Sequence, residues 1–240
     1  MVSQRRLLVM KMGTTLDGIR QSRGDFERWI IDGLGVPEED VDVLDVQAGC
    51  QLPPPEMPLG VVVTGSSAMV SECEVWSERS AQWLAAAVLA ETPVLGICYG
   101  HQLLAHGLGG RVGPNPGGRQ IGTVNVELVA AANGDALLGS LPESFPMHAS
   151  HVESVLELPP GAELLATTVG DPNHAFRVAR RAWGVQFHPE FDADIMRGYL
   201  EARRDVIGSE GLNPDALLGA VTEAPQGSVL LRRFAELVAD

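Results

Sequence analysis

A cysteine held between two glycines constrains this chain more than any other feature of its sequence. An apolar run over residues 94–97 leads directly into Cys98, and Gly96 and Gly100 stand two residues before and two residues after it. A reactive side chain can sit on a sharp turn from strand to helix only where the neighbours at these two positions lack bulk. The pattern G-x-C-x-G therefore predicts a nucleophile elbow, with a strand before Cys98 and a helix after it.

The predicted helix start at Cys98 favours a reactive thiol. Free N–H groups and the positive end of the helix dipole stabilise a thiolate, which lowers the pKa of a cysteine and raises the fraction that can attack. Most lone cysteines are buried structural residues instead. The two glycines favour the nucleophile, because a structural cysteine does not require them.

Charge and composition exclude several classes of partner. The 240 residues include 17 Lys and Arg against 31 Asp and Glu, a formal net charge of −14. Nucleic acids and anionic membrane surfaces bind basic faces, so we expect neither as a partner. The three cysteines form no C-x-x-C pair, and no apolar run reaches the length of a membrane span or of a signal-peptide core. We therefore expect a cytoplasmic protein that acts on small solutes or binds other proteins.

Strands and helices alternate through the first half of the chain. Apolar runs with the length and composition of buried strands occur at residues 5–10, 41–46, 60–64 and 94–97. Helices are expected after Asp25 and after Ser77, both predicted N-caps, while residues 13–24 are expected to form a loop. This alternation indicates a parallel sheet covered by helices on both faces. Active sites of such sheets lie at the carboxyl ends of strands, where Gly65 and Cys98 fall.

The pattern changes after the predicted elbow helix. Segments suited to antiparallel pairing are residues 121–129, 154–158, 163–168, 175–178 and 183–187, the last two as a hairpin. We therefore expect an α/β fold with one mixed sheet, parallel at its core and extended by an antiparallel flank. A single domain is expected over residues 1–240, with a catalytic core over about 5–205 and a helical extension over about 206–240.

A second chemical signal follows the predicted hairpin. Residues 184–187 form an apolar strand that delivers His188 at its end and Glu190 two positions later. In extended geometry such residues face the same way, so His188 can take a proton from Cys98 while Glu190 accepts the other ring N–H. Alone, H-x-E is a weak pattern, more often a solvated histidine near a glutamate. Combined with the elbow it indicates a catalytic triad.

Together these segments resemble a known family. Residues 96–102 and 186–190 are similar to the two motifs of the class I glutamine amidotransferases, whose triad is Cys-His-Glu, and most similar to the GMP synthase branch and its stand-alone relatives. The resemblance is clear from residue 61 to residue 191. It implies a flavodoxin-like three-layer sandwich with a mixed, mostly parallel central sheet, and Cys98, His188 and Glu190 as the catalytic residues.

The resemblance also implies the groups around the triad. Gly65, in the loop that stands where the family has Gly-Gly-Pro, and Tyr99 would supply the N–H groups of an oxyanion hole. Gln102 matches a glutamine that helps to hold the substrate. Ser150 and His151, in a segment similar to the branch's Ser-His-x-Asp-x-Val, would contact the α-amino and α-carboxylate end of glutamine. An ordinary serine and histidine at a strand edge is the alternative for this pair.

The residues also indicate what the site lacks. His101 with His106, and His148 with His151, do not have the i,i+4 spacing of a helical metal site, and no cysteine pair accompanies them. A P-loop of the type G-x-x-x-x-G-K-[ST] is absent. We therefore expect no metal and no cofactor.

Three functions remain open. The first is a glutamine amidotransferase that hydrolyses the γ-amide of L-glutamine and passes ammonia to a synthetase subunit. The second is a γ-glutamyl peptidase or hydrolase acting on other γ-glutamyl compounds, which requires room beyond the amide nitrogen for a larger leaving group. The third is a catalytically silent regulatory subunit. The intact pattern of Cys98, His188 and Glu190 argues against the third, because a silent scaffold does not need a strained elbow.

Overall fold

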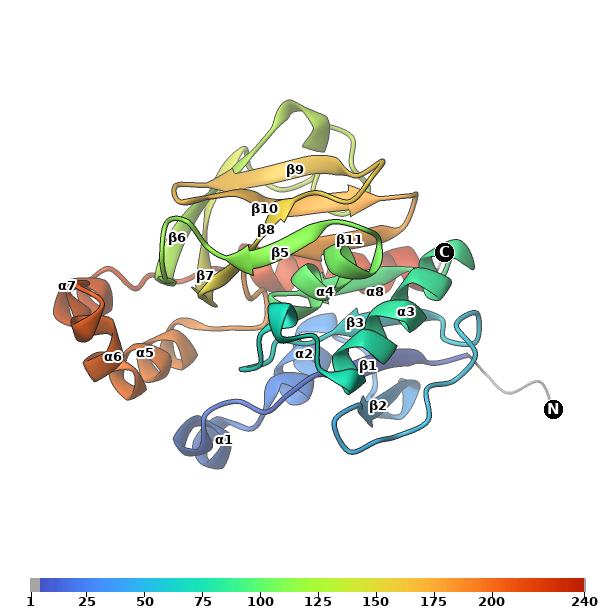
Figure 1. The fold of residues 1–240 in the computed structure, drawn as a ribbon, viewed down its shortest axis with the longest axis horizontal. Helices are drawn as coiled ribbons and strands as arrows, with labels where there is room; N and C mark the ends of the chain where they lie inside the picture. Colours follow the sequence, from blue (N-terminus) through green and yellow to red (C-terminus); the bar gives the residue numbers. More distant parts are fainter. Residues whose placement is uncertain (1–4, 240) are drawn as a thin grey trace.

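Nine strands of the computed structural model, which describes residues 5–239, form one mixed sheet (Figure 1). These strands are β1 (Leu7–Lys11), β2 (Val41–Asp45), β3 (Gly60–Val63), β4 (Val94–Ile97), β6 (Gln120–Leu128), β7 (Ser144–His151), β9 (Glu163–Thr168), β10 (Asp171–Val178) and β11 (Ala182–Val185). Their order across the sheet is β2-β1-β3-β4-β11-β10-β9-β6-β7. Neighbours from β2 to β11 are parallel and those from β11 to β7 antiparallel, which confirms the predicted mixed sheet.

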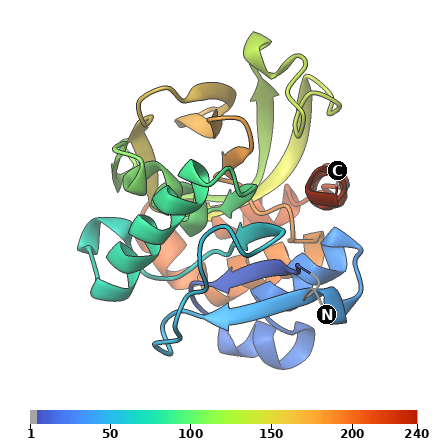
Figure 2. The ribbon, with the colours of Figure 1, turned by 90° about the vertical axis from the view of Figure 1, so that its right-hand side faces the viewer.

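Helices cover both faces of the parallel half. The helices of the described chain are α1 (Asp17–Arg23), α2 (Phe26–Leu34), α3 (Val75–Leu89), α4 (Tyr99–Gly107), α5 (Ala193–Ala202), α6 (Arg204–Ser209), α7 (Pro214–Gly219) and α8 (Gln226–Ala239). Of these, α5 and α7 lie against β6 in the antiparallel half (Figure 1). Alternate residues of β1 face opposite layers: Leu7 and Val9 belong to the core cluster with α2 and α8, whereas Leu8 and Met10 belong to the cluster with α3 and α4. Figure 2 shows α3 and α4 on one side and α8, seen end-on, on the other.

The antiparallel half contains two strands that the sequence pattern did not predict. β7 pairs with β6 along its whole length at the sheet edge, and β5 (Arg111–Pro114) pairs with β8 (Glu153–Glu157) in a separate two-stranded sheet. β7 contains Pro146, which an edge strand tolerates because one side of its ladder is open. The predicted hairpin is present as β10 and β11, with Val178 opposite Ala182.

Two local expectations near the N-terminal helices were wrong. Residues 13–24 are not only loop, since they include α1, whose buried face is Ile19. Arg23, in the last turn of α1, accepts a hydrogen bond through its carbonyl oxygen from the indole nitrogen of Trp29 (2.8 Å), so contacts with α2 stabilise a helix that has weak local signals. Ser77 is not an N-cap: α3 begins at Val75, and the Ser77 hydroxyl lies 2.6 Å from the Tyr99 hydroxyl inside the core.

The prediction for Asp25 is confirmed. Asp25 is the N-cap of α2, and its carboxylate accepts hydrogen bonds from the backbone N–H groups of Phe26 (2.9 Å) and Thr15 (2.8 Å). It also binds the ammonium group of Lys11 (2.8 Å). The cap therefore joins β1, the following loop and α2 at the end of the sheet where the site lies.

The last helix returns to the N-terminal half of the chain. Leu231 and Val238 of α8 lie so close to α2 and β3 that a Cβ at Gly33 or at Gly60 would come within 2.4 or 2.5 Å of them. Phe234 is fully buried and packs edge-on against Trp183 of β11, with ring centroids 6.3 Å apart. Within residues 5–239, no helix is both long and apolar enough to cross a bilayer.

Candidate active site

Cys98 lies on a strained turn between β4 and α4. Its φ and ψ are 51° and −101°, a conformation that residues other than glycine rarely adopt. The backbone N–H of Cys98 donates to the carbonyl oxygen of Val185 in β11 (2.9 Å), and the residue occupies the N-cap position of α4. The thiol is buried, 5% exposed, at the carboxyl end of a central parallel strand. This geometry is that of the predicted nucleophile elbow.

The two flanking glycines are required by backbone contacts. A Cβ at Gly96 would lie 2.4 Å from the carbonyl oxygen of Gly100, and a Cβ at Gly100 would lie 2.5 Å from the carbonyl oxygen of Val63. These atoms belong to the elbow and to β3, so they cannot move aside as a flexible side chain could. The absence of both side chains allows α4 to start directly against the sheet.

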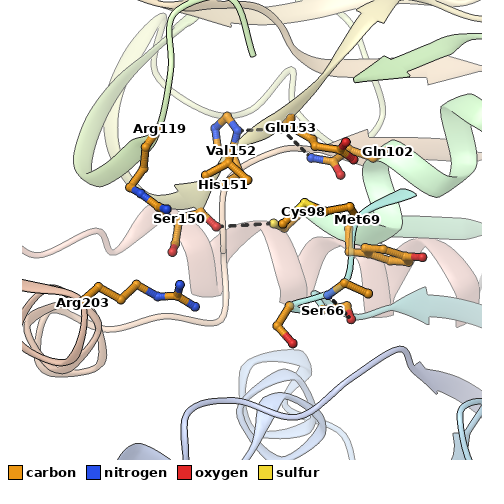
Figure 3. Close-up of a pocket in the computed structure, with 13 residues that line it drawn as sticks. Ser66, Met69, Cys98, Gln102, Arg119, Ser150, His151, Val152, Glu153 and Arg203 are labelled. Atoms are coloured by element: carbon orange, nitrogen blue, oxygen red, sulfur yellow. Dashed lines mark hydrogen bonds between the residues drawn. The ribbon is translucent and has the colours of Figure 1, made fainter. Parts of the chain in front are cut away.

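His188 and Glu190 form a buried pair beside the thiol. His188 lies just after β11, where its backbone N–H donates to the carbonyl oxygen of His148 in β7 (2.8 Å). Its Nδ1 is 2.7 Å from Oε1 of Glu190, and neither side chain is more than 3% exposed. Cys98 lies close enough to the ring for its charge to raise the pKa of His188, and its thiol donates a hydrogen bond to the carbonyl oxygen of Ser150 (3.9 Å; Figure 3). The structure thus brings together the three residues that the two motifs predicted.

The electrostatics of this group favour a protonated histidine. Burial acts to lower the pKa of His188, but the negative charge of Glu190 and the charge and hydrogen bond of Cys98 outweigh it and raise the pKa to about 10. The proton therefore resides on the imidazole at neutral pH, between a carboxylate and a sulfur that can carry negative charge.

Two phenylalanines that the sequence analysis missed fix the imidazole plane. Phe191 stacks on His188 with centroids 4.1 Å apart and an interplanar angle of 15°, and Phe26 lies 6.2 Å away in a nearly parallel orientation. Phe191 directly follows Glu190 in sequence, which was the available signal. Phe26 comes from the first turn of α2 and gave no local signal.

The predicted oxyanion donors lie close to the candidate triad. Gly65 follows β3, and a Cβ there would come within 3.0 Å of Cε1 of His188, so the position has no room for a side chain. Tyr99 begins α4, where N–H groups have no partner within the helix. Among the described residues, neither backbone N–H donates to a backbone carbonyl.

The residues expected to hold substrate line a small hollow of about 80 Å³ above Cys98 (Figure 3). Nε2 of Gln102 donates to the carbonyl oxygen of Glu153 (2.7 Å) and to Gln186 (3.0 Å). His151 has Nδ1 2.9 Å from the same carbonyl oxygen and Nε2 3.0 Å from Oε1 of Gln120. Both ring nitrogens of His151 therefore lie against oxygen atoms of the protein, only one of which can accept the single N–H of a neutral imidazole, whereas the side chain of Ser150 has no partner in the described chain.

A second hollow of about 310 Å³ also borders the sulfur of Cys98. It shares Ser66, Ser67, Cys98, Ser150 and Arg203 with the first, but its remaining lining is different. Four of the remaining residues precede or begin α1, and the others come from α2, from the segment after β11 and from α5. Together they are Thr14, Thr15, Leu16, Asp17, Phe26, His188 and Tyr199. The thiol thus stands where the two hollows meet.

Two arginines reach the smaller hollow, and the sequence analysis identified neither. Arg119 makes a two-pronged ion pair with Glu210 at 2.7 and 2.9 Å, which satisfies its charge within the protein. Arg203, at the junction of α5 and α6, extends toward the space between Ser150 and the thiol (Figure 3). No motif marks either residue, because their positions depend on how the C-terminal helices pack.

A buried cluster of His151, Asp171 and His174 lies behind the smaller hollow. Its nitrogen and oxygen atoms fall within 4.8 Å of one another, a grouping that a metal ion could use. Hydrogen bonds already occupy Asp171, whose carboxylate accepts from Ser154 (3.0 Å), and both ring nitrogens of His151. We assign the cluster to support of the strand that carries Ser150, and the absence of a metal stays a prediction.

Comparison with known proteins identifies the family. The model of the family "Glutamine amidotransferase class-I" matches residues 24–202, more than half of the chain. The chain belongs to this family. This confirms the relationship predicted from the two motifs and makes the chain an enzyme of the amidotransferase class. The triad geometry described above lies within the matched residues.

Individual relatives agree with this assignment. The GMP synthase [glutamine-hydrolyzing] of Aeropyrum pernix is 40% identical over 158 residues, which are 65% of this chain and 28% of that protein. The same-named protein of Thermomicrobium roseum is 38% identical over 148 residues, 60% of this chain and 26% of that protein. The chain therefore matches under a third of these relatives' length. A crystal structure of a Thermotoga maritima glutamine amidotransferase superposes with a TM-score of 0.77 at 25% identity, covering 98% of this amidotransferase and 99% of that chain.

Proposed function

We propose that this amidotransferase hydrolyses the γ-amide of L-glutamine to glutamate and ammonia through a thioester on Cys98. The observation that carries the proposal is the buried pair of His188 and Glu190, 2.7 Å apart, beside the Cys98 sulfur on an elbow where that sulfur lines two hollows. A buried thiol without a reaction to perform would not need this arrangement.

The reaction follows from the protonation state of the pair. The Cys98 thiolate attacks the γ-carbon of glutamine, and the developing oxyanion accepts hydrogen bonds from the N–H groups of Gly65 and Tyr99. His188 then gives its proton to the amide nitrogen, the C–N bond breaks and ammonia leaves. Water loses a proton to His188 and attacks the thioester, which releases glutamate and restores the Cys98 thiolate beside protonated His188. Glu190 keeps the imidazole oriented throughout.

The smaller hollow would hold the amino-acid end of glutamine. We assign hydrogen bonding of that end to Ser150 and to the amide oxygen of Gln102, which accepts no hydrogen bond within the described chain. His151 lines the same hollow and, with its pKa lowered to about 4 mainly by burial, carries only one N–H for the two oxygen atoms beside its ring, so we also keep it as a contact for that end. We further propose a reducing compartment for the protein, because the thiol of Cys98 must stay free, as all three cysteines are here.

The ammonia acceptor would be a separate synthetase subunit. This inference rests on the names of the relatives, whose matched region is 26% or 28% of their length. The rest of those proteins, more than two thirds of their length, lies outside the segment that matches this chain. We therefore propose that ammonia released at Cys98 is used by a partner.

Glutamate release by the purified protein tests the proposal. With glutamine as substrate we expect steady glutamate formation that is lost in Cys98→Ala and kept in Cys50→Ala, a change at an exposed cysteine. A glutamine analogue bearing an electrophile should label Cys98, which mass spectrometry of the peptides would locate. If no γ-glutamyl compound is cleaved and Cys98 resists labelling, the silent regulatory subunit becomes the correct interpretation.

A further inference from the structure

The larger hollow lies where a leaving group must go. His188 is the acid that protonates the departing nitrogen in the proposed reaction, so whatever leaves does so on the His188 side of the sulfur. The hollow of about 310 Å³ is the one that His188 lines, and the smaller hollow is not. Ammonia occupies about the volume of a water molecule, roughly 30 Å³. This side of the site is therefore larger than the release of ammonia requires.

Arg203 supplies an uncompensated positive charge to this hollow. The chain carries 31 acidic against 17 basic residues, yet no carboxylate lies within ion-pair distance of Arg203 among residues 5–239. Its Nε is buried and has no hydrogen-bond partner in the same part of the chain. Asp17, the acidic residue that also lines the hollow, is paired instead with Arg20 at 3.0 Å.

The guanidinium of Arg203 is held in place by the helix that carries it. Its central carbon lies 5.7 Å from the centroid of the Tyr199 ring, and the Tyr199 hydroxyl is 2.6 Å from the hydroxyl of Thr15 across the hollow. Burial is also the main influence that lowers the pKa of Arg203, which shows that the group has lost part of its hydration. A desolvated, oriented guanidinium is suited to bind a carboxylate through two parallel hydrogen bonds.

We propose that the larger hollow is a leaving-group site for γ-glutamyl amides whose amine carries a carboxylate, and that Arg203 binds that carboxylate. The substrate class is therefore γ-glutamyl amino acids or short γ-glutamyl peptides. The proposal rests on the proposed function, because the same thiol and histidine perform the chemistry. Under this proposal, the site that hydrolyses glutamine also acts as a γ-glutamyl hydrolase.

The chemical steps are those of glutamine hydrolysis with a larger amine. Cys98 forms the thioester with the γ-carbon, the C–N bond breaks, and the amino group of the departing amino acid takes the proton from His188. Its carboxylate stays against Arg203 until the amino acid diffuses away. Water then cleaves the thioester to glutamate as before, and no further reactant is needed.

A matched pair of substrates tests the role of Arg203. γ-Glutamylglycine differs from γ-glutamyl methylamide by one carboxylate on the leaving group, so the ratio of their kcat/KM values reports that carboxylate alone. We expect the ratio to favour γ-glutamylglycine and to fall about 10- to 100-fold in Arg203→Gln, the effect of losing a charge-assisted, two-pronged contact. Arg203→Lys should restore part of the ratio.

The adjacent arginine provides the control. Arg204 pairs with Glu201 and Asp215 on the surface and lines neither hollow, so Arg204→Gln should leave the ratio as in the unmodified protein. An equal loss on both substrates in Arg203→Gln would overturn the proposal, because Arg203 would then bind the glutamyl part that the two share. Cleavage of glutamine alone would also overturn it, while leaving the proposed function intact.

Binding gives a readout that does not depend on turnover. In Cys98→Ala protein, calorimetry should show tighter binding of γ-glutamylglycine than of γ-glutamyl methylamide, and the difference should vanish when Arg203→Gln is added. Equal binding of the two compounds without the second substitution would refute a carboxylate site at Arg203, whatever the activity of the enzyme.

Discussion

At the scale of single residues, the site depends on one proton shared among three side chains. His188 is buried and stacked on the ring of Phe191, an environment that by itself would keep it neutral. The carboxylate of Glu190, at 2.7 Å, reverses that effect and keeps the proton on the imidazole. His188, the proposed acid for the leaving group, is therefore already charged at neutral pH.

Glu190→Gln should reduce activity and change its pH dependence. The pKa of His188 is raised from an ordinary 6.5 to about 10, so its proton is retained through neutral pH and lost only in alkaline solution. Without the Glu190 charge, burial dominates, and His188 should deprotonate at lower pH. We expect kcat/KM for glutamine to fall by about 10²- to 10⁴-fold and its alkaline limb to move toward neutral pH. The pH profile of glutamate release measures both.

The raised pKa of His188 also makes the stability of the fold depend on pH. A raised histidine pKa stabilises the folded chain fully below about pH 6.5, and this contribution is lost as pH rises toward 10.

For the Glu190→Gln experiment, the control for a general loss of negative charge is Glu201→Gln, at an exposed ion pair with Arg204. A Glu190→Gln profile with an unmoved alkaline limb would mean that Glu190 does not set the pKa of His188.

At the scale of elements, the turns that follow the parallel strands determine where the residues of the candidate site lie. The elbow after β4 exists because β3, β4 and α4 approach so closely that two positions exclude a side chain. The cap of α2 exists because one carboxylate binds two backbone N–H groups and an ammonium. Both turns lie at the carboxyl ends of parallel strands, so the stability of these turns and the geometry of the site are coupled.

Gly100→Ala should damage both stability and the reactive thiol. The added Cβ would lie 2.5 Å from the Val63 carbonyl oxygen, so the strand or the helix must shift. We expect a loss of about 2–4 kcal/mol in the free energy of unfolding, measured in urea, together with slower labelling of Cys98. Gly208→Ala is the control, since a Cβ there meets nothing within 4 Å and should be neutral or stabilise α6 by about 0.5–1 kcal/mol.

Asp25→Asn should weaken the fold in a pH-dependent way. Burial tends to raise the pKa of Asp25, but the hydrogen bond from Lys11 and those from Thr15 and Phe26 outweigh it, and the net pKa is lowered. The carboxylate therefore stabilises the fold above its ordinary pKa of about 3.8, and the contribution disappears as pH falls through the lowered value.

We expect this substitution to cost about 1–3 kcal/mol at pH 7, and the difference from the unmodified protein to shrink in urea titrations below pH 3.8. Asp42→Asn, in a pair with Arg6 whose members are at least half exposed, should cost less than about 1 kcal/mol. A difference for Asp25→Asn that is constant with pH would show that the cap acts without its charge.

At the scale of the whole molecule, the two ends of the chain share one core. α8 packs between α2 and β3, and residues from the last helix belong to the same buried cluster as Val9 and Leu95. The C-terminal helices also place Arg203 beside the thiol and pair Arg119 with Glu210. Residues after the motifs therefore complete both the core and the site.

Phe234→Ala should destabilise the whole protein although it lies far from Cys98 in sequence. The ring is fully buried against Trp183, so its removal leaves a cavity between α8 and the sheet. We expect a loss of about 3–5 kcal/mol in urea unfolding, against less than about 1 kcal/mol for Val229→Ala, which is 47% exposed on the same helix. Similar losses for the two variants would contradict a role of α8 in the core.

The sequence by itself determined the features that depend on neighbouring residues. Gly96 and Gly100 specify the elbow because the clash they avoid is local, and the apolar runs of β1, β3 and β4 specify buried parallel strands. The two motifs also identified the family, since each motif is continuous in the chain, and they predict as catalytic the three residues that the structure brings together.

Only the tertiary structure decided the features that arise from packing between distant segments. β7 contains a proline and polar residues, yet it forms because eight of its residues pair with β6. α1 forms through its contacts with Trp29 and α5. The hollow beside His188 joins a loop before α1 to Arg203, almost 190 residues later. No local sequence pattern predicts that these two segments lie together, because their contact depends on how both ends of the chain pack into one core.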